Sequence, residues 1–255
     1  GNNAFAFCMK LKTVTFQDPV KCKIEELGDN AFSFCIKLES FGELPRSVKR
    51  IGRGCFSTCK HLQAINIPAN SELRVIGEGA FQRCSIHKLF IPAKVSVLEE
   101  GWSKLAWNLD GIELSNENKN FELIDDSYLV TKTDIPILIY ASYALENATI
   151  PSKVQKIGKN SFSYHYKLRN VSFFSDPNSY QTSLVEIGDE AFMHCEKIKN
   201  ITAIPTTVKR IGIRAFFACI GMKSLTFYPP TDQQPQLEEI AEEAFSDLNH
   251  QFLQQ

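Results

Sequence analysis

The sequence predicts an α/β repeat fold, a right-handed solenoid with a curved parallel β-sheet on its concave side and short helical turns on the other. Three observations predict it. Phenylalanine is abundant, with 19 Phe against 7 Tyr and 2 Trp in 255 residues. A segment of the form Ile-Gly-x-x-Ala-Phe-x-x-Cys recurs along the chain, and aliphatic residues follow each copy at fixed positions. A repeat of roughly 24 to 30 residues is typical of solenoids, whose units pack against their neighbours.

The recurring segment accounts for eight anchor phenylalanines, which are Phe5, Phe32, Phe56, Phe81, Phe162, Phe192, Phe216 and Phe245. Phe81 and Phe162 are 81 residues apart, a distance that divides into three steps of 27. Two degenerate units should therefore lie between them. The patterns Leu109-x-x-Ile112-x-Leu114 and Leu145-x-x-Ala148-x-Ile150 fit the same template and place these units.

The residues after each Cys predict short strands. Apolar and polar residues alternate at Thr13-Val14-Thr15-Phe16 and at Ile65-Asn66-Ile67, which is typical of half-buried strands. Stacked coils would place these strands side by side as a parallel sheet. A Pro often follows, and it ends the strand because it has no N–H for the ladder.

The Ala-Phe-x-x-Cys segment predicts a helical turn on the opposite side, where the Phe fills the space between coils. The glycine after each Ile is expected in a turn conformation closed to other residues. These glycines are Gly28, Gly52, Gly77, Gly158, Gly188 and Gly212.

Composition excludes two classes of protein. Lys and Arg number 28 and Asp and Glu 29, so the net charge of −1 argues against a nucleic-acid binder. The longest uncharged apolar run, Ile135–Leu145, contains Pro136 and is far shorter than the roughly 20 residues of a membrane span. We therefore expect neither a nucleic-acid partner nor a membrane span in this segment.

Six of the eight cysteines share one repeat column, in which other coils have Ala106 or His165. These six are Cys8, Cys35, Cys59, Cys84, Cys195 and Cys219. Stacked coils point such side chains in parallel, which is poor disulfide geometry, so we expect buried free thiols. Cys22 and Cys55 are off the column, and Cys55-x-x-x-Cys59 has no paired set at zinc spacing. No metal site is predicted.

No enzyme is predicted either. None of the five histidines (His61, His87, His165, His194 and His250) lies in a metal-binding helix motif, and His165 simply occupies the Cys column. Gly52-x-Gly54 and Gly77-x-Gly79 follow from the repeat and lack the third glycine of a dinucleotide loop. No nucleophile elbow or phosphate loop is present, so neither catalytic residues nor a cofactor are expected.

The remaining candidate is a protein-binding face on the sheet, because the x positions of Leu-x-x-Ile-x-Ile face solvent. The candidate residues are Lys12, Gln63, His87, Lys88, Phe90, Arg169, Lys199 and Lys223. Arg169, Lys199 and Lys223 form a basic stripe, and Phe90 is an aromatic of the kind that anchors partners. A plain solvated face is the alternative interpretation. The glycosylation sequons at Asn147, Asn170 and Asn200 fall on the same strands, where a glycan would cover the sheet. Either the protein never meets the glycosylation machinery, as in a bacterium, or the concave face is not the working one.

The full unit, Leu-x-x-Ile-x-Ile-Pro-x-x-Val-x-x-Ile-Gly-x-x-Ala-Phe-x-x-Cys, resembles the BspA-like leucine-rich-repeat family over essentially the whole chain. The longer irregular unit of that family resembles Asn120-Phe121, Asp125–Leu129 and Tyr140-Ala141, with Asp126 in place of Gly and Ala141 in place of Pro. The resemblance implies a leucine-rich-repeat solenoid and a cell-surface or secreted protein. Members of that family are similar to adhesins that bind host matrix proteins or other cells.

These inferences define one expected domain, a leucine-rich-repeat solenoid over residues 1–255. Regular coils are expected at about 1–97 and 151–255, and irregular long repeats at about 98–150. The expected function is non-enzymatic binding of a protein ligand, such as a host extracellular matrix or cell-surface protein. A structural spacer of a larger surface protein and an intracellular interaction scaffold are alternatives. Because neither end has a polar cap, we expect a piece of a longer protein or end-to-end self-association.

Overall fold

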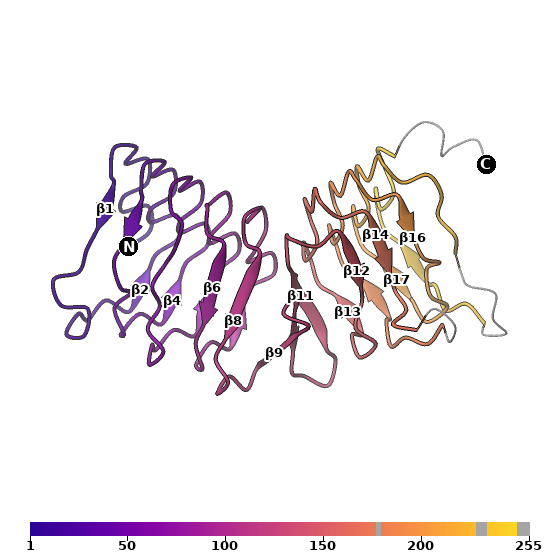
Figure 1. Cartoon of the computed structure of the whole chain (residues 1–255), viewed down its shortest axis with the longest axis horizontal. Coiled ribbons are helices and arrows are strands. Elements are labelled where there is room, and N and C mark those ends of the chain that lie inside the picture. The colour runs from indigo at the N-terminus through magenta and orange to yellow at the C-terminus, as the bar shows by residue number, and fades with distance from the viewer. Residues whose placement is uncertain (177–179, 228–233, 249–255) are drawn as a thin grey trace. The chain divides into compact units, whose positions relative to one another are not determined.

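The computed structural model describes residues 1–176, 180–227 and 234–248. The chain divides into two compact units, Gly1–Leu129 and Val130–Gln255, and each is a stack of short coils (Figure 1). Every strand among the described residues has five residues or fewer. No helix occurs in these ranges, so the repeat is built from strands and turns.

The first unit contains three parallel sheets, each made of short strands from successive coils. Their orders are β1-β3, β2-β4-β5-β7 and β6-β8. The strands are β1 (Thr13–Val14), β2 (Glu26–Leu27), β3 (Ser40–Phe41), β4 (Arg50–Ile51), β5 (Val75–Ile76), β6 (Lys88–Ile91), β7 (Val97–Leu98) and β8 (Gly111–Leu114), and β9 (Phe121–Ile124) follows them.

The second unit repeats this plan. One parallel sheet has the order β12-β14-β16, and in another β11, β13, β15, β17 and β18 are successive parallel neighbours. These strands are β11 (Ile137–Ala141), β12 (Asn147–Thr149), β13 (Lys156–Ile157), β14 (Asn170–Ser172), β15 (Glu186–Ile187), β16 (Asn200–Ile201), β17 (Arg210–Ile211) and β18 (Glu239–Ile240), and β10 (Tyr128–Thr131) precedes them.

The strands confirm the two hidden repeat units, since β8 and β12 lie where the degenerate templates placed them. The expected strand at residues 65–67 does not form, although Ile65 and Ile67 are buried as the pattern predicts. The structure adds a second row of strands that sequence analysis missed. Most of its members lie directly before the repeated Gly, as Arg50–Ile51 does before Gly52; β7 and β18 precede Glu99 and Ala241 instead.

The Ala-Phe-x-x-Cys segments are runs of turns, so the expected helical turns are not found in the described residues. In the second coil the Ala31 N–H donates to Gly28 O over 3.2 Å, and the Cys35 N–H donates to Phe32 O over 3.1 Å. Asn30 and Phe34, the third residues of these two turns, have φ of 54° and 59°. A left-handed third residue is typical of type II turns.

The intervening N–H groups bond to the next coil, and this explains why no helix forms. The N–H groups of Asn30, Phe32 and Phe34 each donate over 2.8 Å to carbonyls of the following coil. In an α-helix these donors would bond four residues back within the same segment. Hydrogen bonds thus join successive coils on the turn side as well as in the sheets.

The repeated glycines are required by close packing between coils and not by a left-handed backbone. A Cβ on Gly52 would lie 2.6 Å from Asp29 N, and one on Gly77 would lie 2.6 Å from Arg53 N. Neither glycine has positive φ, so the expectation of a special turn conformation is wrong. Left-handed glycines occur two residues later instead, at Gly54 and Gly79, both with φ of 57°.

The anchor phenylalanines form one stack of rings in each unit. Phe5, Phe32, Phe56 and Phe81 are stacked in the first unit, with centroids 5.1 to 5.8 Å apart. The stack in the second unit consists of Phe162, Phe192, Phe216 and Phe245, with centroids 4.7 to 5.2 Å apart. Because each ring touches the rings of adjacent coils, the stack forms a continuous apolar core.

All eight cysteines are free, and six of them are buried. Five thiols of the Cys column donate to a Phe carbonyl of the preceding coil; Cys59, for example, donates to Phe32 O over 3.2 Å. Cys8 belongs to the same column but is exposed. The prediction of buried free thiols is therefore confirmed except at Cys8.

Candidate binding surface

The strand face is the set of outward-pointing side chains on β6 and β8 in the first unit and on β12, β14 and β16 in the second. Of the candidate residues in the first unit, Lys12, Gln63, His87 and Lys88 are exposed, and Phe90 is half-buried. Carboxylates of the next coil lie beside two of these groups. Lys88 Nζ lies 3.3 Å from Glu113 Oε2, and His87 Nδ1 lies 3.3 Å from Asp110 Oδ2.

The strand face of the second unit carries an asparagine ladder, defined as Asn147, Asn170 and Asn200. Strand register places these three residues opposite one another on β12, β14 and β16. Asn170 Nδ2 donates to Asn147 Oδ1 over 2.5 Å, and Asn200 Nδ2 donates to Asn170 Oδ1 over 2.7 Å. The three sequon asparagines thus hydrogen-bond to one another, and they hold this surface uncharged and ordered.

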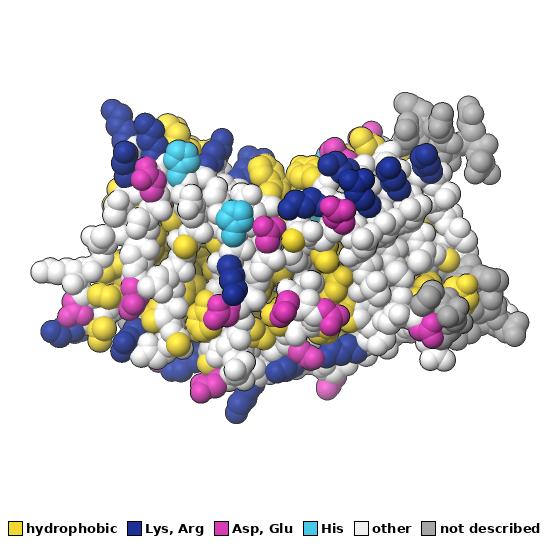
Figure 2. Space-filling view, in the orientation of Figure 1, with side chains coloured by type: hydrophobic (Ala, Val, Ile, Leu, Met, Phe, Trp, Pro, Cys, Tyr) yellow, Lys and Arg dark blue, Asp and Glu magenta, His cyan; other side chains and the backbone are white. Residues whose placement is uncertain are grey.

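A basic row, defined as Arg169, Lys199 and Lys223, borders the ladder. The Lys199 N–H donates to Arg169 O over 2.8 Å, which places these two residues on adjacent coils. All three side chains are exposed. Arg169 Nε lies 3.5 Å from Glu146 Oε2, whereas Lys199 and Lys223 have no ion pair within the described residues. Figure 2 shows Lys and Arg side chains gathered along one border of a largely uncharged surface in this unit.

The other sheet of each unit neutralises its cations, in contrast to the basic row. Arg50 on β4 lies 2.8 Å from Glu26 and 2.9 Å from Asp29. Arg210 on β17 makes the equivalent contacts, at 3.0 Å to Glu186 and 2.9 Å to Asp189. Burial alone would raise the pKa of Asp189, but hydrogen bonds from Arg210 and a backbone N–H outweigh it and lower that pKa. Asp189 therefore stays ionised and remains paired with Arg210.

An aromatic cluster on the turn side was missed by sequence reasoning. The rings of Tyr164 and His194 stack at 4.8 Å, and Tyr166 and Phe217 approach them edge-on at 6.1 and 5.7 Å. The first unit has an equivalent stack of Phe7 on Phe34 at 4.9 Å. The signal was available, because Phe7, Phe34, Tyr164 and His194 all directly precede a residue of the Cys column.

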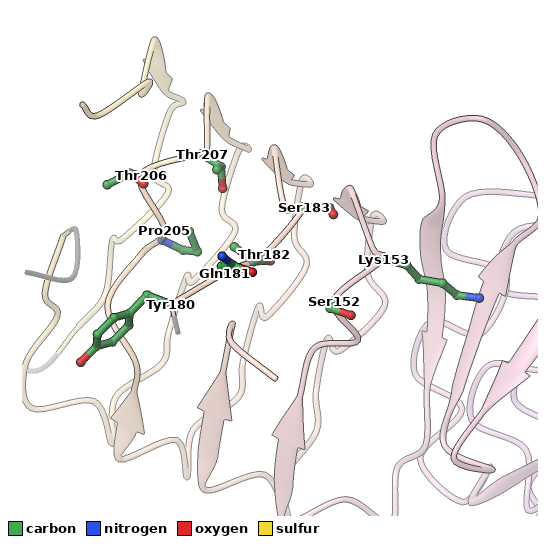
Figure 3. A pocket seen from close by; sticks show the side chains of 9 residues that line it. All are labelled: Ser152, Lys153, Tyr180, Gln181, Thr182, Ser183, Pro205, Thr206 and Thr207. Carbon is green, nitrogen blue, oxygen red and sulfur yellow. The ribbon is translucent and has the colours of Figure 1, made fainter. Parts of the chain in front are cut away.

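A pocket of about 590 Å³ opens beside the loops that follow the strands of the second unit (Figure 3). Its lining is rich in hydroxyl groups and consists of Ser152, Lys153, Tyr180, Gln181, Thr182, Ser183, Pro205, Thr206 and Thr207. Internal hydrogen bonds already use some of these hydroxyls: Thr207 donates to Leu184 O, and Thr182 accepts from the Leu184 N–H. Lys153 points away from the other lining residues (Figure 3), so the polar groups do not converge on one ligand.

The buried cysteines and His165 have pKa values that do not suit nucleophilic or acid–base catalysis. Burial raises the pKa of Cys35 to about 11 and that of Cys219 to about 12, so both remain thiols at neutral pH. His165 occupies the Cys column as predicted and contacts Ala141 O through Nε2 at 3.1 Å. Its burial lowers its pKa to about 4, and the imidazole is therefore neutral. Within the described residues no group of three or more His, Cys, Asp or Glu could hold a metal ion; His250 lies outside them.

Comparison with known proteins identifies the repeat. A family profile described as BspA type leucine rich repeat region matches residues 1–104 and 133–254 in six copies. Among solved structures, a leucine rich cell surface protein from Faecalibacterium prausnitzii A2-165 is 24% identical with a TM-score of 0.72, over 97% of this chain and 68% of its own. The pneumococcal vaccine antigen PcpA is 23% identical with a TM-score of 0.70, over 86% of this chain and 60% of its own.

At these identities the two structures show a shared fold and no more. Comparison with curated proteins gave no match. Across the described residues, no helix has the length and apolar character needed to cross a membrane.

Proposed function

The chain belongs to the BspA-type leucine-rich repeat family, and from this premise we propose that it is a non-enzymatic module that binds another protein at a cell surface or outside the cell. Membership of this family supports a role as a protein-interaction module. One structural neighbour is described as a cell surface protein and another as a vaccine antigen, which supports the proposed location. The proposed ligand class is host matrix or cell-surface protein.

The strand face of the second unit carries this proposal. It combines a ladder of uncharged, mutually hydrogen-bonded amides with the cations Lys199 and Lys223, which have no carboxylate partner in the described part of the chain, and with Arg169, which contacts Glu146. An ordered surface loses little side-chain entropy when a partner binds, and cations at its border attract a partner of opposite charge. The candidate residues of the first unit lie outside the proposed contact; Lys88 and His87 there already lie beside carboxylates.

The proposal is tested by binding to immobilised fibronectin, laminin and collagen, measured by surface plasmon resonance. We expect at least one of them to bind the chain. Exchange of both Lys199 and Lys223 for Glu should weaken that binding about tenfold or more. The matched control is the double exchange of Lys12 and Lys88 for Glu in the first unit, which changes the net charge equally. Equal losses in both double variants would contradict the assignment to the second unit.

Absence of binding to all three proteins would count against adhesion and favour the alternative role of a structural spacer. An intracellular scaffold is favoured by one observation, the eight free cysteines, because secreted proteins usually have disulfides. Six of these thiols are buried, and this removes most of the objection that free cysteines raise to a location outside the cell. We therefore retain the surface location as the proposal.

A further inference from the structure

We propose that the basic row receives an acidic helical segment of the partner protein, laid across the strands of the second unit. This inference rests on the proposed function, since it names the chemistry of the partner at the same face. The partner helix would present Glu or Asp at one position per turn, and these carboxylates would pair with Arg169, Lys199 and Lys223.

The spacing of the row favours a helix. Adjacent strands of a sheet lie about 4.8 Å apart, and Arg169 and Lys199 precede directly opposed residues of β14 and β16. Carboxylates on one helix face recur about every 5.4 Å, so the mismatch for the step from Arg169 to Lys199 is roughly 0.6 Å. An extended acidic segment that alternates its charges repeats them about every 6.7 Å, which gives a mismatch of roughly 2 Å for the same step. Flexible lysine side chains absorb the first mismatch more readily than the second.

The charge state of the row favours an anion. Lys199 and Lys223 are exposed and have no ion pair within the described residues. The contact of Arg169 with Glu146 joins two side chains that are 48% and 61% exposed. Such exposed pairs contribute little, so an incoming carboxylate can compete with Glu146 for the guanidinium. In the first unit, by contrast, Lys88 and His87 already face Glu113 and Asp110.

The surface beside the basic row restricts which side chains the partner helix can carry next to its acidic residues. Asn147, Asn170 and Asn200 form an uncharged polar strip next to the cations. Burying an apolar helix face against these amides would remove them from water without replacing their hydrogen bonds. The partner helix should therefore carry polar or small side chains beside its acidic stripe.

Four probes test the inference on the whole chain. The first is a peptide of about 21 residues in an Ala/Gln background, with Glu on one helical face at i, i+4, i+7 and i+11. The second has the same composition but distributes its Glu around the helix. The third alternates Glu with Thr and Pro and cannot form a helix. The fourth is heparin, a sulfated polysaccharide.

We expect the one-face helix to bind about tenfold or more tightly than the other two peptides in about 50 mM salt. The Lys199→Glu/Lys223→Glu variant should lose this binding, and the Lys12→Glu/Lys88→Glu control should retain it. Equal binding of the two helical peptides, or tighter binding of the extended peptide or of heparin, would overturn the inference. If the charge-reversal variant fails to fold, Lys199→Gln/Lys223→Gln replaces it with the same expectation.

Competition separates failure of this inference from failure of the proposed function. The one-face peptide should displace any matrix protein that binds the chain. If a matrix protein binds through Lys199 and Lys223 but the peptide neither binds nor competes, the helical partner is wrong and the protein-binding role stands. If no matrix protein binds while the peptide does, the proposed ligand class is wrong and the acidic helix specificity stands.

Discussion

At the scale of single residues, the glycines of each coil fall into two classes that look alike in the sequence. Gly77 is needed because the backbone of the preceding coil lies where its Cβ would be, whereas Gly79 adopts a left-handed conformation. Asn30 and Asn160 adopt the same conformation at positions equivalent to Gly79. The repeat predicted both sets of glycines, but the distance between coils that separates their roles is visible only in three dimensions.

This distinction predicts opposite outcomes for two substitutions that lie two residues apart. Gly77→Ala should destabilise the protein by about 2 kcal/mol or more, because the methyl group would meet Arg53 N at 2.6 Å. Gly79→Asn should change stability by less than about 1 kcal/mol, because Asn tolerates positive φ. Urea denaturation followed by circular dichroism measures both. Similar losses in the two variants would refute the two-class interpretation.

His165 makes stability depend on pH. Burial holds its pKa at about 4 in the folded protein, below its value of about 6.5 in the unfolded chain. The unfolded state therefore binds more protons between these values, and the free energy of unfolding falls as pH decreases from about 6.5 to 4. The stabilisation is fully present above this window, and its loss amounts to at most roughly 3 kcal/mol.

His165→Cys restores the common residue of the column and removes this titration. We expect the stability difference between parent and variant to shift in favour of the variant as pH falls from 7 to 4.5. Other titrating groups cancel in the comparison, which requires urea midpoints at several pH values. A difference that stays constant with pH would show that the imidazole is not held neutral by burial.

At the scale of elements, most strands of the repeat template were predictable, whereas the second row of strands and the turns were not. Alternation of apolar and polar residues placed the strands near Thr13–Val14 and Asn170–Ser172 correctly. The Ala-Phe-x-x-Cys spacing suits a helical turn equally well as a pair of type II turns. The choice depends on hydrogen bonds to the next coil, which no single repeat contains. The recurring Asn or Gly before Ala-Phe was the local signal for the left-handed residues.

The anchor phenylalanines differ in their contribution to stability, because they occupy different places in the ring stacks. Phe192 is fully buried and stacks on Phe162 at 4.7 Å and on Phe216 at 5.1 Å. Phe192→Ala should therefore cost about 3–5 kcal/mol. Phe5 is 48% exposed and has one stacked neighbour, so Phe5→Ala should cost less than half as much. Thermal and denaturant unfolding of the two variants provide the measurement, and equal costs would contradict a stack that carries the core.

At the scale of the whole molecule, the sequence predicted which repeat columns lie on the strand face. Only the structure showed which charged residues of these columns contact a carboxylate. Sequence analysis named Lys88 and Arg169 as candidate residues without assigning them partners, and in the structure each contacts a carboxylate of a neighbouring coil. Lys199 and Lys223 contact none within the described residues. Some of these contacts could have been predicted from the sequence. His87 and Asp110, for example, occupy the same repeat position in successive coils, and parallel register places such residues side by side. The aromatic cluster was not predicted, because its column also contains residues such as Thr58 and Arg83 and so has no uniform aromatic pattern.

The central claim is that the strand face of the second unit contacts a protein partner, and lysine footprinting tests it most directly. The chain is acetylated alone and in complex with whichever of fibronectin, laminin and collagen it binds, and modification of each lysine is measured by mass spectrometry. The account predicts strong protection of Lys199 and Lys223, with Lys12 and Lys88 labelled as in the free chain. Protection of other lysines while Lys199 and Lys223 stay fully reactive would contradict it.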